Sequence, residues 1–520
     1  MDKTQSITVQ GTRFVDPQGR HVLLHGINLV NKDPNAGYFF DEGPERFAAM
    51  ADWGFNCIRL GVIWDGLEPE PGAYDEAYLR RLDQRIAWAR AHGLLVFLDM
   101  HQDLYSVLFS DGAPAWATLT GGAPHVDLGG VWSDAYFTSP AVQAALDAFW
   151  ANAPAPDGLG LQDHYAAAWA HLADRFESEP AVIGYDLMNE PFPGSSAAPA
   201  LQAMFAQGAE LLSALDAAAL DGAAYDAEQL SAQWLDEAGR SQILQRLEDV
   251  ELYAQVIDVT QPIFAAFEQG PLMEMYRRVA AAIRAVDAHT PLYLETTMGG
   301  NMGVYSAVAA LPGDGGRDGQ QVYAPHGYDL VVDTPSIAAA SPGRVALIFR
   351  RHAETARRLE MPMLVGEWGA YGRHEGTLPA AWQVVRQFEK ALCSDTYWAY
   401  EPGIEAFPCF QALQRPYPER VAGTLLHYHY DPQTGVFACA WCEEGVLTAP
   451  SRVYLPGWLA WDEQTVELTP TGQGFEVAAT RPGSQSVYLT IPPTGAACER
   501  HLIVGEMHSV EPTHSKRQRE

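Results

Sequence analysis

The chain has 520 residues, of which 48% are hydrophobic and 19% charged, so it can bury a large core and is not wholly disordered. Its 33 Lys and Arg residues against 65 Asp and Glu residues give a net charge of −32. A surface this acidic repels phosphate backbones and anionic bilayers. We therefore expect a neutral substrate, with neither nucleic acid nor stable membrane insertion, and the oligomeric state is left open.

Targeting and redox signals are weak. The first ten residues lack the cationic start and apolar run of a secretory signal, and the six cysteines are scattered, as free thiols in a reducing compartment would be. We expect a cytoplasmic location, with secretion as the alternative. Cys439 and Cys442 look like half of a zinc site, but no second pair follows, and strand residues three apart point to opposite faces. No metal is predicted.

Short apolar runs alternate with helical patterns over about 400 residues. The runs are continuous rather than alternating, which is typical of strands buried on both faces of a parallel sheet. Eight such strands are predicted, at Val22–Asn28, Cys57–Gly61, Leu94–Met100, Val182–Met188, Pro291–Thr296, Gln321–His326, Pro362–Trp368 and Thr396–Glu401.

Helices are predicted between these strands. Asp75 can cap a helix with a one-sided apolar face that stops at Gly93, Ser139-Pro140 opens another, and Arg344–Leu359 reads as a third. Eight strand-then-helix units predict an α/β fold of the (β/α)8 TIM-barrel class over residues 1–420. In such barrels the chemistry lies where the C-terminal ends of the strands meet the following loops.

Two stretches break this rhythm. A helical insertion is predicted at about 195–270, after the fourth strand. Its residues 211–260 carry ten acids and two arginines, a net charge of −8. It is either a lid on the catalytic rim or an outward-facing decoration. From about 421 to 507, short strands separated by turns predict a small antiparallel β-sandwich domain, and residues 508–520 read as a disordered tail.

Two glutamates have equivalent positions in the predicted barrel. Met188-Asn189-Glu190-Pro191 ends the fourth strand, and Val365-Gly366-Glu367-Trp368 ends the seventh. Two carboxyl groups that approach one cavity mouth suit glycosidic cleavage, because one protonates the leaving oxygen while the other attacks the anomeric carbon. A retaining mechanism requires the two carboxyl groups to lie about 5–5.5 Å apart.

At these residues the chain resembles glycoside hydrolase family 5, a family of retaining β-glycosidases, over about residues 10–402. The resemblance implies that Glu190 is the acid/base and Glu367 the nucleophile, with no cofactor. It also implies that the other residues at the family's motif positions bind the substrate; these are Arg59, His101, Asn189, His326, Tyr328 and Trp398. On this basis Glu190 should have a raised pKa, while Arg59 should keep Glu367 ionised.

A narrower resemblance concerns the loops after strands one and three. Lys32 and Asp103 match sugar-contacting positions of the endoglycoceramidase and glucosylceramidase branch of that family. Two apolar rim loops, around 38–40 and 104–109, suit either a lipid ligand or packing beneath the insertion. We therefore expect retaining hydrolysis of a glycolipid such as a glucosyl- or galactosylceramide. The alternatives are a β-glucosidase or endoglucanase that acts on soluble saccharides and, in another class, a non-catalytic binding protein.

Overall fold

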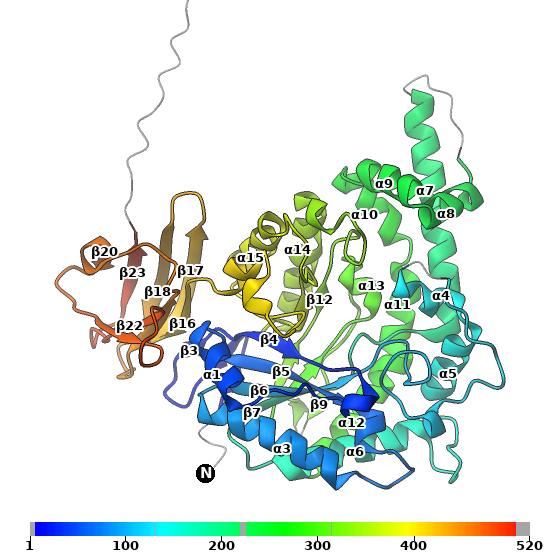
Figure 1. Cartoon of the computed structure of the whole chain (residues 1–520), viewed down its shortest axis with the longest axis horizontal. Helices are drawn as coiled ribbons and strands as arrows, with labels where there is room; N and C mark the ends of the chain where they lie inside the picture. The colour runs from blue at the N-terminus through cyan, green and yellow to red at the C-terminus, as the bar shows by residue number, and fades with distance from the viewer. Residues whose placement is uncertain (1–5, 129–130, 219–224, 314, 506–520) are drawn as a thin grey trace, which may run out of the picture. The chain divides into compact units, whose positions relative to one another are not determined.

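The computed structural model describes residues 6–128, 131–218, 225–313 and 315–505. The predicted tail at 508–520 lies outside these residues. The chain divides into two compact units: one contains Val22–Gln414 with the N-terminal residues up to Pro17, and the other contains Arg415 onward with Gln18–His21 (Figure 1). No helix in the part of the chain described is long and apolar enough to cross a membrane.

The first unit is the predicted barrel. Its sheet has eight parallel strands, in the order β11-β8-β7-β6-β5-β4-β15-β13. They are β4 (His25–Leu29), β5 (Cys57–Ile63), β6 (Leu95–His101), β7 (Val182–Asp186), β8 (Leu292–Leu294), β11 (Gln321–Tyr323), β13 (Leu364–Val365) and β15 (Ser394–Tyr397). The two outer strands, β11 and β13, are joined by a parallel bridge between Tyr323 and Met363 and by the pairing of β12 (His326–Gly327) with β14 (Glu367–Trp368). The TIM-barrel prediction is confirmed.

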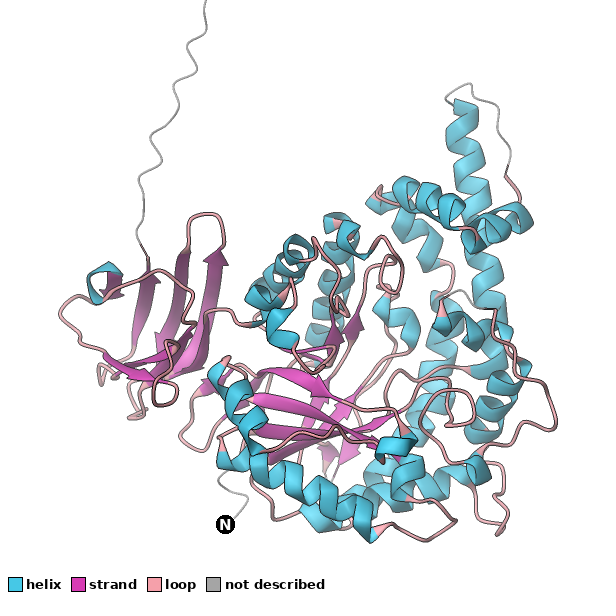
Figure 2. Ribbon diagram, in the orientation of Figure 1, coloured by secondary structure: helices cyan, strands magenta, loops and turns pink. Residues whose placement is uncertain are grey.

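Helices surround this sheet (Figure 2). The main ones are α1 (Pro44–Asp52), α3 (Glu76–Ala91), α5 (Pro140–Trp150), α6 (Leu161–Phe176), α12 (Met273–Arg284), α14 (Pro342–Leu359) and α15 (Leu378–Ala391). Asp75 caps α3 by accepting hydrogen bonds from the amides of Ala77 and Tyr78, as predicted. α14 begins two residues before the predicted Arg344, because Ser341 caps it and Pro342 occupies a first-turn position that needs no amide.

Several strand bounds differ from the prediction. The sixth strand breaks at Pro325, which has no amide hydrogen to donate, and continues as β12. The eighth strand is Ser394–Tyr397 rather than Thr396–Glu401. Its first two residues are polar but buried, since Ser394 accepts from the Leu24 amide at 3.0 Å and Asp395 lies 3.2 Å from the His25 ring.

The polarity of the barrel interior changes along its axis. Alternate residues of a strand face the same side, so Phe97, Asp99 and His101 follow one another along the inner face of β6. Phe97 stacks on Tyr293, with ring centroids 4.8 Å apart. Tyr293 lies on β8, and Glu295 follows it two positions later, directly after the end of that strand. The barrel is therefore packed with apolar rings at one end and carries charge where its strands terminate.

The helical insertion lies between β7 and β8. It consists of α7 (Ala198–Ala218), α8 (Ala227–Leu235), α9 (Glu237–Arg246), α10 (Val250–Asp258) and α11 (Gln261–Phe267). Its helices share their own apolar cluster, which includes Leu212, Leu230, Tyr253 and Ile257. Aspartates cap α8, α9 and α10, so part of the acidic character of this segment serves to begin helices.

The second unit is an antiparallel β domain, also as predicted. One sheet has the order β17-β18-β23-β20, and β16, β19, β22 and β21 lie in that order in the other. The strands are β16 (Tyr417–Val421), β17 (Gly423–Asp431), β18 (Val436–Glu443), β19 (Ser451–Leu455), β20 (Val466–Thr469), β21 (Glu476–Ala479), β22 (Val487–Ile491) and β23 (Cys498–Val504). On β18, Cys439 is buried and Cys442 exposed, so the two thiols face opposite sides.

Candidate active site

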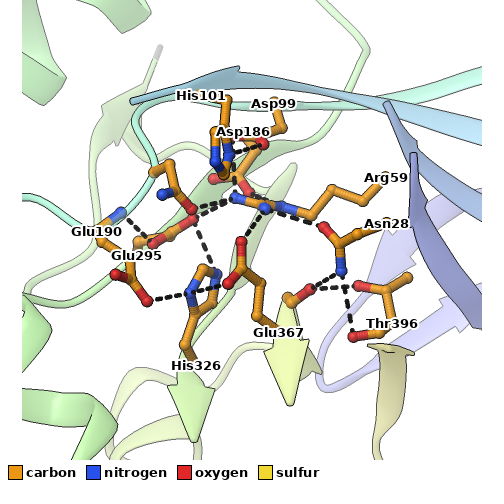
Figure 3. Close-up of polar contacts among 12 residues, drawn as sticks. Asn28, Arg59, Asp99, His101, Asp186, Glu190, Glu295, His326, Glu367 and Thr396 are labelled. Carbon is orange, nitrogen blue, oxygen red and sulfur yellow. Dashed lines mark hydrogen bonds and ion pairs between the residues drawn. The ribbon is translucent and has the colours of Figure 1, made fainter. Parts of the chain in front are cut away.

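A fully buried arginine organises the C-terminal end of the barrel (Figure 3). Arg59, on β5, makes ion pairs of 2.7–2.9 Å with four carboxylates, Asp99, Asp186, Glu295 and Glu367. It also donates to the side-chain oxygens of Asn28 and Asn189, both at 3.0 Å. A guanidinium has five donors in a rigid plane, so it can hold several carboxylates at the ends of different strands in one arrangement.

The two predicted catalytic glutamates meet beside this arginine. Glu190, His326 and Glu367 have nitrogen and carboxylate oxygen atoms that all lie within 4.8 Å of one another. The His326 Nδ1 atom is 2.9 Å from Glu190 Oε1 and 3.5 Å from Glu367 Oε2. Tyr328 donates its hydroxyl to Glu367 Oε2 at 2.9 Å. The carboxyl separation is short, on the side of retaining rather than inverting glycosidases.

Glu190 has an unusual backbone conformation. Its φ angle is +43°, in the left-handed region that non-glycine residues rarely adopt. Such a conformation costs on the order of 1–3 kcal/mol and needs support from its surroundings. Glu295 Oε2 accepts the Glu190 amide at 2.7 Å, and the Gln102 side-chain amide donates to the carbonyls of Asn189 and Glu190 at 2.7 and 3.2 Å. These contacts turn the Glu190 side chain toward Asn301 and His326.

The ionisation of the pair differs from the sequence-based expectation. Burial raises the pKa of Glu190, but hydrogen bonds from His326 and Asn301 outweigh burial and leave that pKa below its ordinary value. Burial raises the pKa of Glu367 to about 8, although His326 and Arg59 oppose the rise. The prediction of a raised pKa at Glu190 and an ionised Glu367 is therefore wrong for the substrate-free site. Two close carboxyls in a buried site share one proton.

The remaining predicted residues line the same site. His101 Nδ1 lies 2.8 Å from Asp99 Oδ2, and the His101 ring stacks on Trp398 with centroids 5.1 Å apart. Lys32 pairs with Asp103, lies 3.7 Å from Asp111, and places its ammonium 4.8 Å from the centre of the Trp398 ring. All ten predicted site residues are thus brought together, while their roles stay predictions.

The sequence reasoning missed several residues of this network. Glu295 follows β8 directly, which is the same kind of strand-end position that identified Glu190 and Glu367, so that criterion would have found it. Asn301 donates to Glu190 Oε1 at 2.6 Å from the short helix α13 (Met298–Asn301), and nothing in the local sequence marks it. The others are Asn28, Asp99, Gln102, Asp111, Asp186 and Trp132.

Clusters of acidic and histidine side chains here raise the question of a metal ion. Asp99, Asp186 and Glu295 form one such group and His101, Asp103 and Asp111 another. The first group already surrounds the Arg59 guanidinium, and two members of the second pair with the Lys32 ammonium. These protein cations occupy the places where a metal would bind. The third group is the catalytic pair with His326.

One cavity of about 330 Å³ connects the catalytic pair to the insertion. Its polar end is lined by Glu190, Glu367, Tyr328 and Trp398. Its apolar walls come mainly from the insertion helices, with Phe205, Leu212, Leu230, Trp234, Leu247 and Val256 among the lining residues. The insertion therefore lies on the catalytic rim, which decides between the two placements left open by the sequence.

Two aromatic side chains of the apolar rim loops pack in neither of the two expected ways. Phe39 packs on Tyr78 of α3 with ring centroids 5.0 Å apart, and Tyr105 packs on Phe149 of α5 at 5.6 Å. Neither aromatic lines the catalytic cavity. Phe39 and Tyr105 are thus buried against barrel helices, whereas Leu108 is exposed and Leu104 and Phe109 line a second, smaller cavity. The apolar wall of the catalytic cavity is supplied by the insertion instead.

The chain matches known proteins over most of its length. The model described as cellulase (glycosyl hydrolase family 5) matches residues 15–221 and 251–403, and that described as the glycoside hydrolase family 5 C-terminal domain matches 415–502. Endoglycoceramidase I of Rhodococcus hoagii is 38% identical over 192 residues, which are 36% of this chain and 38% of that protein. The alignment thus spans well under half of this curated relative.

Solved structures match more completely. Endo-glycoceramidase II from Rhodococcus sp. in its ganglioside GM3 complex has 26% identity and a TM-score of 0.71, covering 96% of this chain and 100% of that chain. The same protein as a lactosyl-enzyme intermediate has 26% identity and a TM-score of 0.70, covering 95% and 99%. Because the family model covers well over half of the sequence, this chain belongs to glycoside hydrolase family 5.

Proposed function

We propose that this protein is a retaining β-glycosidase that cleaves the bond between the sugar and the lipid of a glycolipid such as a glycosylceramide. The observation that carries the proposal is the single cavity that joins Glu190 and Glu367 to the apolar walls of the insertion. A glycolipid is polar at one end and apolar at the other, and burial of its hydrocarbon between such walls is favourable. The likeness to solved endoglycoceramidase structures supports the same substrate class.

The chemistry follows from the positions of the carboxyls. Glu367 attacks the anomeric carbon while Glu190 gives its proton to the leaving oxygen, so the sugar becomes esterified to Glu367 and the lipid alcohol departs. Glu190, now ionised, takes a proton from water, whose oxygen attacks the same carbon and frees Glu367. The overall reaction consumes one water and retains the anomeric configuration.

The shared proton must lie on Glu190 when this reaction begins. His326 is well placed to move it, because its Nδ1 atom contacts both carboxyls. Burial disfavours its charge, but Glu295 and Glu367 raise the pKa of His326 well above its ordinary value, which favours the protonated ring. It can give its Nδ1 proton to Glu190 and take one back from Glu367, which leaves Glu367 ionised for attack.

The decisive experiment compares substrates that share a sugar. Wild-type protein is assayed on glucosyl- and galactosylceramide in detergent, on cello-oligosaccharides and on an aryl β-glycoside. We expect turnover of a glycosylceramide, and a fall in activity of about 10³-fold or more in Glu367→Gln. Cleavage of cello-oligosaccharides alone would favour the soluble-substrate alternative. No activity on any of the substrates would favour a binding protein.

A second cavity bears on how much sugar the site accepts. It has a volume of about 280 Å³ and shares Lys32, Asp103 and Trp132 with the catalytic cavity. Its other lining residues are Leu104, Phe109, Ser110, His125, Asp127 and Ala135. Polar groups and an aromatic ring suit further sugar units. We therefore expect lactosylceramide to release its disaccharide intact. Release of galactose alone from lactosylceramide would show that the enzyme removes terminal sugars.

A further inference from the structure

A third glutamate joins the groups on both sides of the catalytic pair. Glu295 is buried at the end of β8. Its Oε1 atom accepts from Arg59 at 2.8 Å and lies 3.2 Å from His326 Nε2, and its Oε2 atom accepts the backbone amide of Glu190 at 2.7 Å. One carboxylate thus contacts the arginine beside the nucleophile, the histidine between the two carboxyls, and the backbone of the acid/base residue.

The contact with the Glu190 amide has a particular consequence. Glu190 is held at φ +43°, a conformation that a glutamate would leave without support. Gln102 holds the carbonyl side of this residue and Glu295 holds its amide. The direction of the Glu190 carboxyl, and so its reach to a leaving oxygen, depends on this backbone conformation.

The contact between Glu295 and His326 also affects the Glu190 carboxyl, through the histidine ring. With Nε2 against Glu295, the ring presents Nδ1 to Glu190 Oε1 at 2.9 Å. Asn301 contacts that same oxygen at 2.6 Å. Glu295 therefore sets the orientation of a group that the Glu190 carboxyl touches directly.

We propose that Glu295 is a positioning residue for the proton donor Glu190, holding its backbone and orienting the histidine that faces its carboxyl. The inference rests on the proposed function. It assigns to Glu295 no contact with the sugar. It predicts that loss of Glu295 impairs proton donation more than nucleophilic attack.

Glu295→Gln separates these effects. A glutamine side chain has only one acceptor oxygen. The position that Glu295 Oε1 occupies faces both Arg59 and His326, so it requires an acceptor. The oxygen therefore turns to those two donors and the amide NH2 faces the Glu190 N–H, so the backbone contact is lost while the side chain keeps its size. Glu295→Asp, which keeps the charge but is shorter by one methylene, is the second variant in case the first does not fold.

Leaving-group dependence reports on proton donation. A 2,4-dinitrophenolate departs without a proton, whereas a phenolate needs one. For Glu295→Gln we expect kcat/KM to fall about 100-fold on phenyl β-lactoside and by no more than about threefold on 2,4-dinitrophenyl β-lactoside. Azide should partly restore kcat on the dinitrophenyl substrate, because it attacks the glycosyl-enzyme without a general base.

Glu268 provides the matched control. Glu268 is as buried as Glu295. It accepts hydrogen bonds from Thr296 and Thr297, which follow Glu295 directly in the chain, and from Ser306 and Ala307. None of these four residues belongs to the catalytic pair. Glu268→Gln should lower the unfolding temperature and leave the ratio of the two kcat/KM values unchanged.

Equal losses on both lactosides in Glu295→Gln, or no loss on either, would overturn the proposed role. If instead the wild type hydrolyses neither lactoside nor any glycosylceramide, the proposed function itself is wrong, and this inference falls with it.

Discussion

The proton shared by Glu190 and Glu367 is the main feature of the site at the scale of single residues. Burial raises the pKa of Glu367 to about 8 against the opposing charges of His326 and Arg59, while His326 and Asn301 bring the pKa of Glu190 down against the effect of burial. The pair titrates in two steps, one near the pKa of each carboxyl. At a pH between these two steps the pair holds one proton, which is the number that the double-displacement mechanism needs. The two steps belong to the pair rather than to either carboxyl alone.

The pH profile of kcat/KM should therefore be bell-shaped. Activity should fall as the pH rises through about 8, because the pair then loses its last proton. In Asn301→Ala, the ionised form of Glu190 loses a hydrogen-bond donor, so its pKa rises and the acidic limb should move to higher pH. The profiles are measured on an aryl β-glycoside. An acidic limb that stays in place or moves to lower pH in Asn301→Ala would contradict this account.

At the scale of elements, the insertion determines what the cavity can bind. The barrel strands supply carboxylates, arginine and histidine, whereas α7 to α10 supply most of the apolar lining. A barrel rim without the insertion would suit soluble saccharides, because it would lack apolar walls against which a hydrocarbon chain could be buried. Three aspartates of the insertion cap its helices, and the acidic side chains described from α7 to α11 are exposed, so its negative charge is compatible with an apolar inner face.

Phe205 of α7 lines the cavity and tests this role. In Phe205→Glu, kcat/KM on a detergent-dispersed glycosylceramide should fall about 10- to 100-fold. This fold-change corresponds to the free energy of burying one large apolar side chain against the lipid. Activity on an aryl β-glycoside should change little, because that substrate reaches only the polar end. Leu215→Glu on the same helix is the control, since Leu215 is 46% exposed and does not line the cavity. Parallel losses on both substrates would mean that Phe205 serves the fold.

At the scale of the whole molecule, the chain consists of two compact units. The C-terminal unit contains a buried ion pair, Arg500 with Glu443, and the Arg500 guanidinium lies 5.4 Å from the centre of the Trp441 ring. A buried pair contributes little by itself, but removal of one partner leaves a charge without compensation.

Arg500→Ala should therefore lower the free energy of unfolding of the C-terminal unit by about 3–5 kcal/mol. Calorimetry on the full chain measures this effect. Glu476→Ala on β21, where the side chain is exposed, is the matched control and should change the unfolding free energy by no more than about 0.5 kcal/mol. An unchanged calorimetric profile in Arg500→Ala would show that solvent compensates Glu443.

The sequence by itself determined the architecture and most of the catalytic residues. Both are written in local patterns: continuous apolar runs mark buried parallel strands, and a carboxylate directly after such a run marks the active end of a barrel. Glu190 and Glu367 were therefore predictable from their immediate neighbours in the chain.

Only the tertiary structure decided which groups surround those carboxyls. The low pKa of Glu190 depends on His326 and Asn301, which are more than 100 positions away in the chain. Likewise, the apolar loop at 38–40 and the insertion helix at 198–218 were both candidates for the barrel rim, yet only the helix lines the cavity. Electrostatic fields and packing act between neighbours in space, and the residues that become neighbours are set when the whole chain folds.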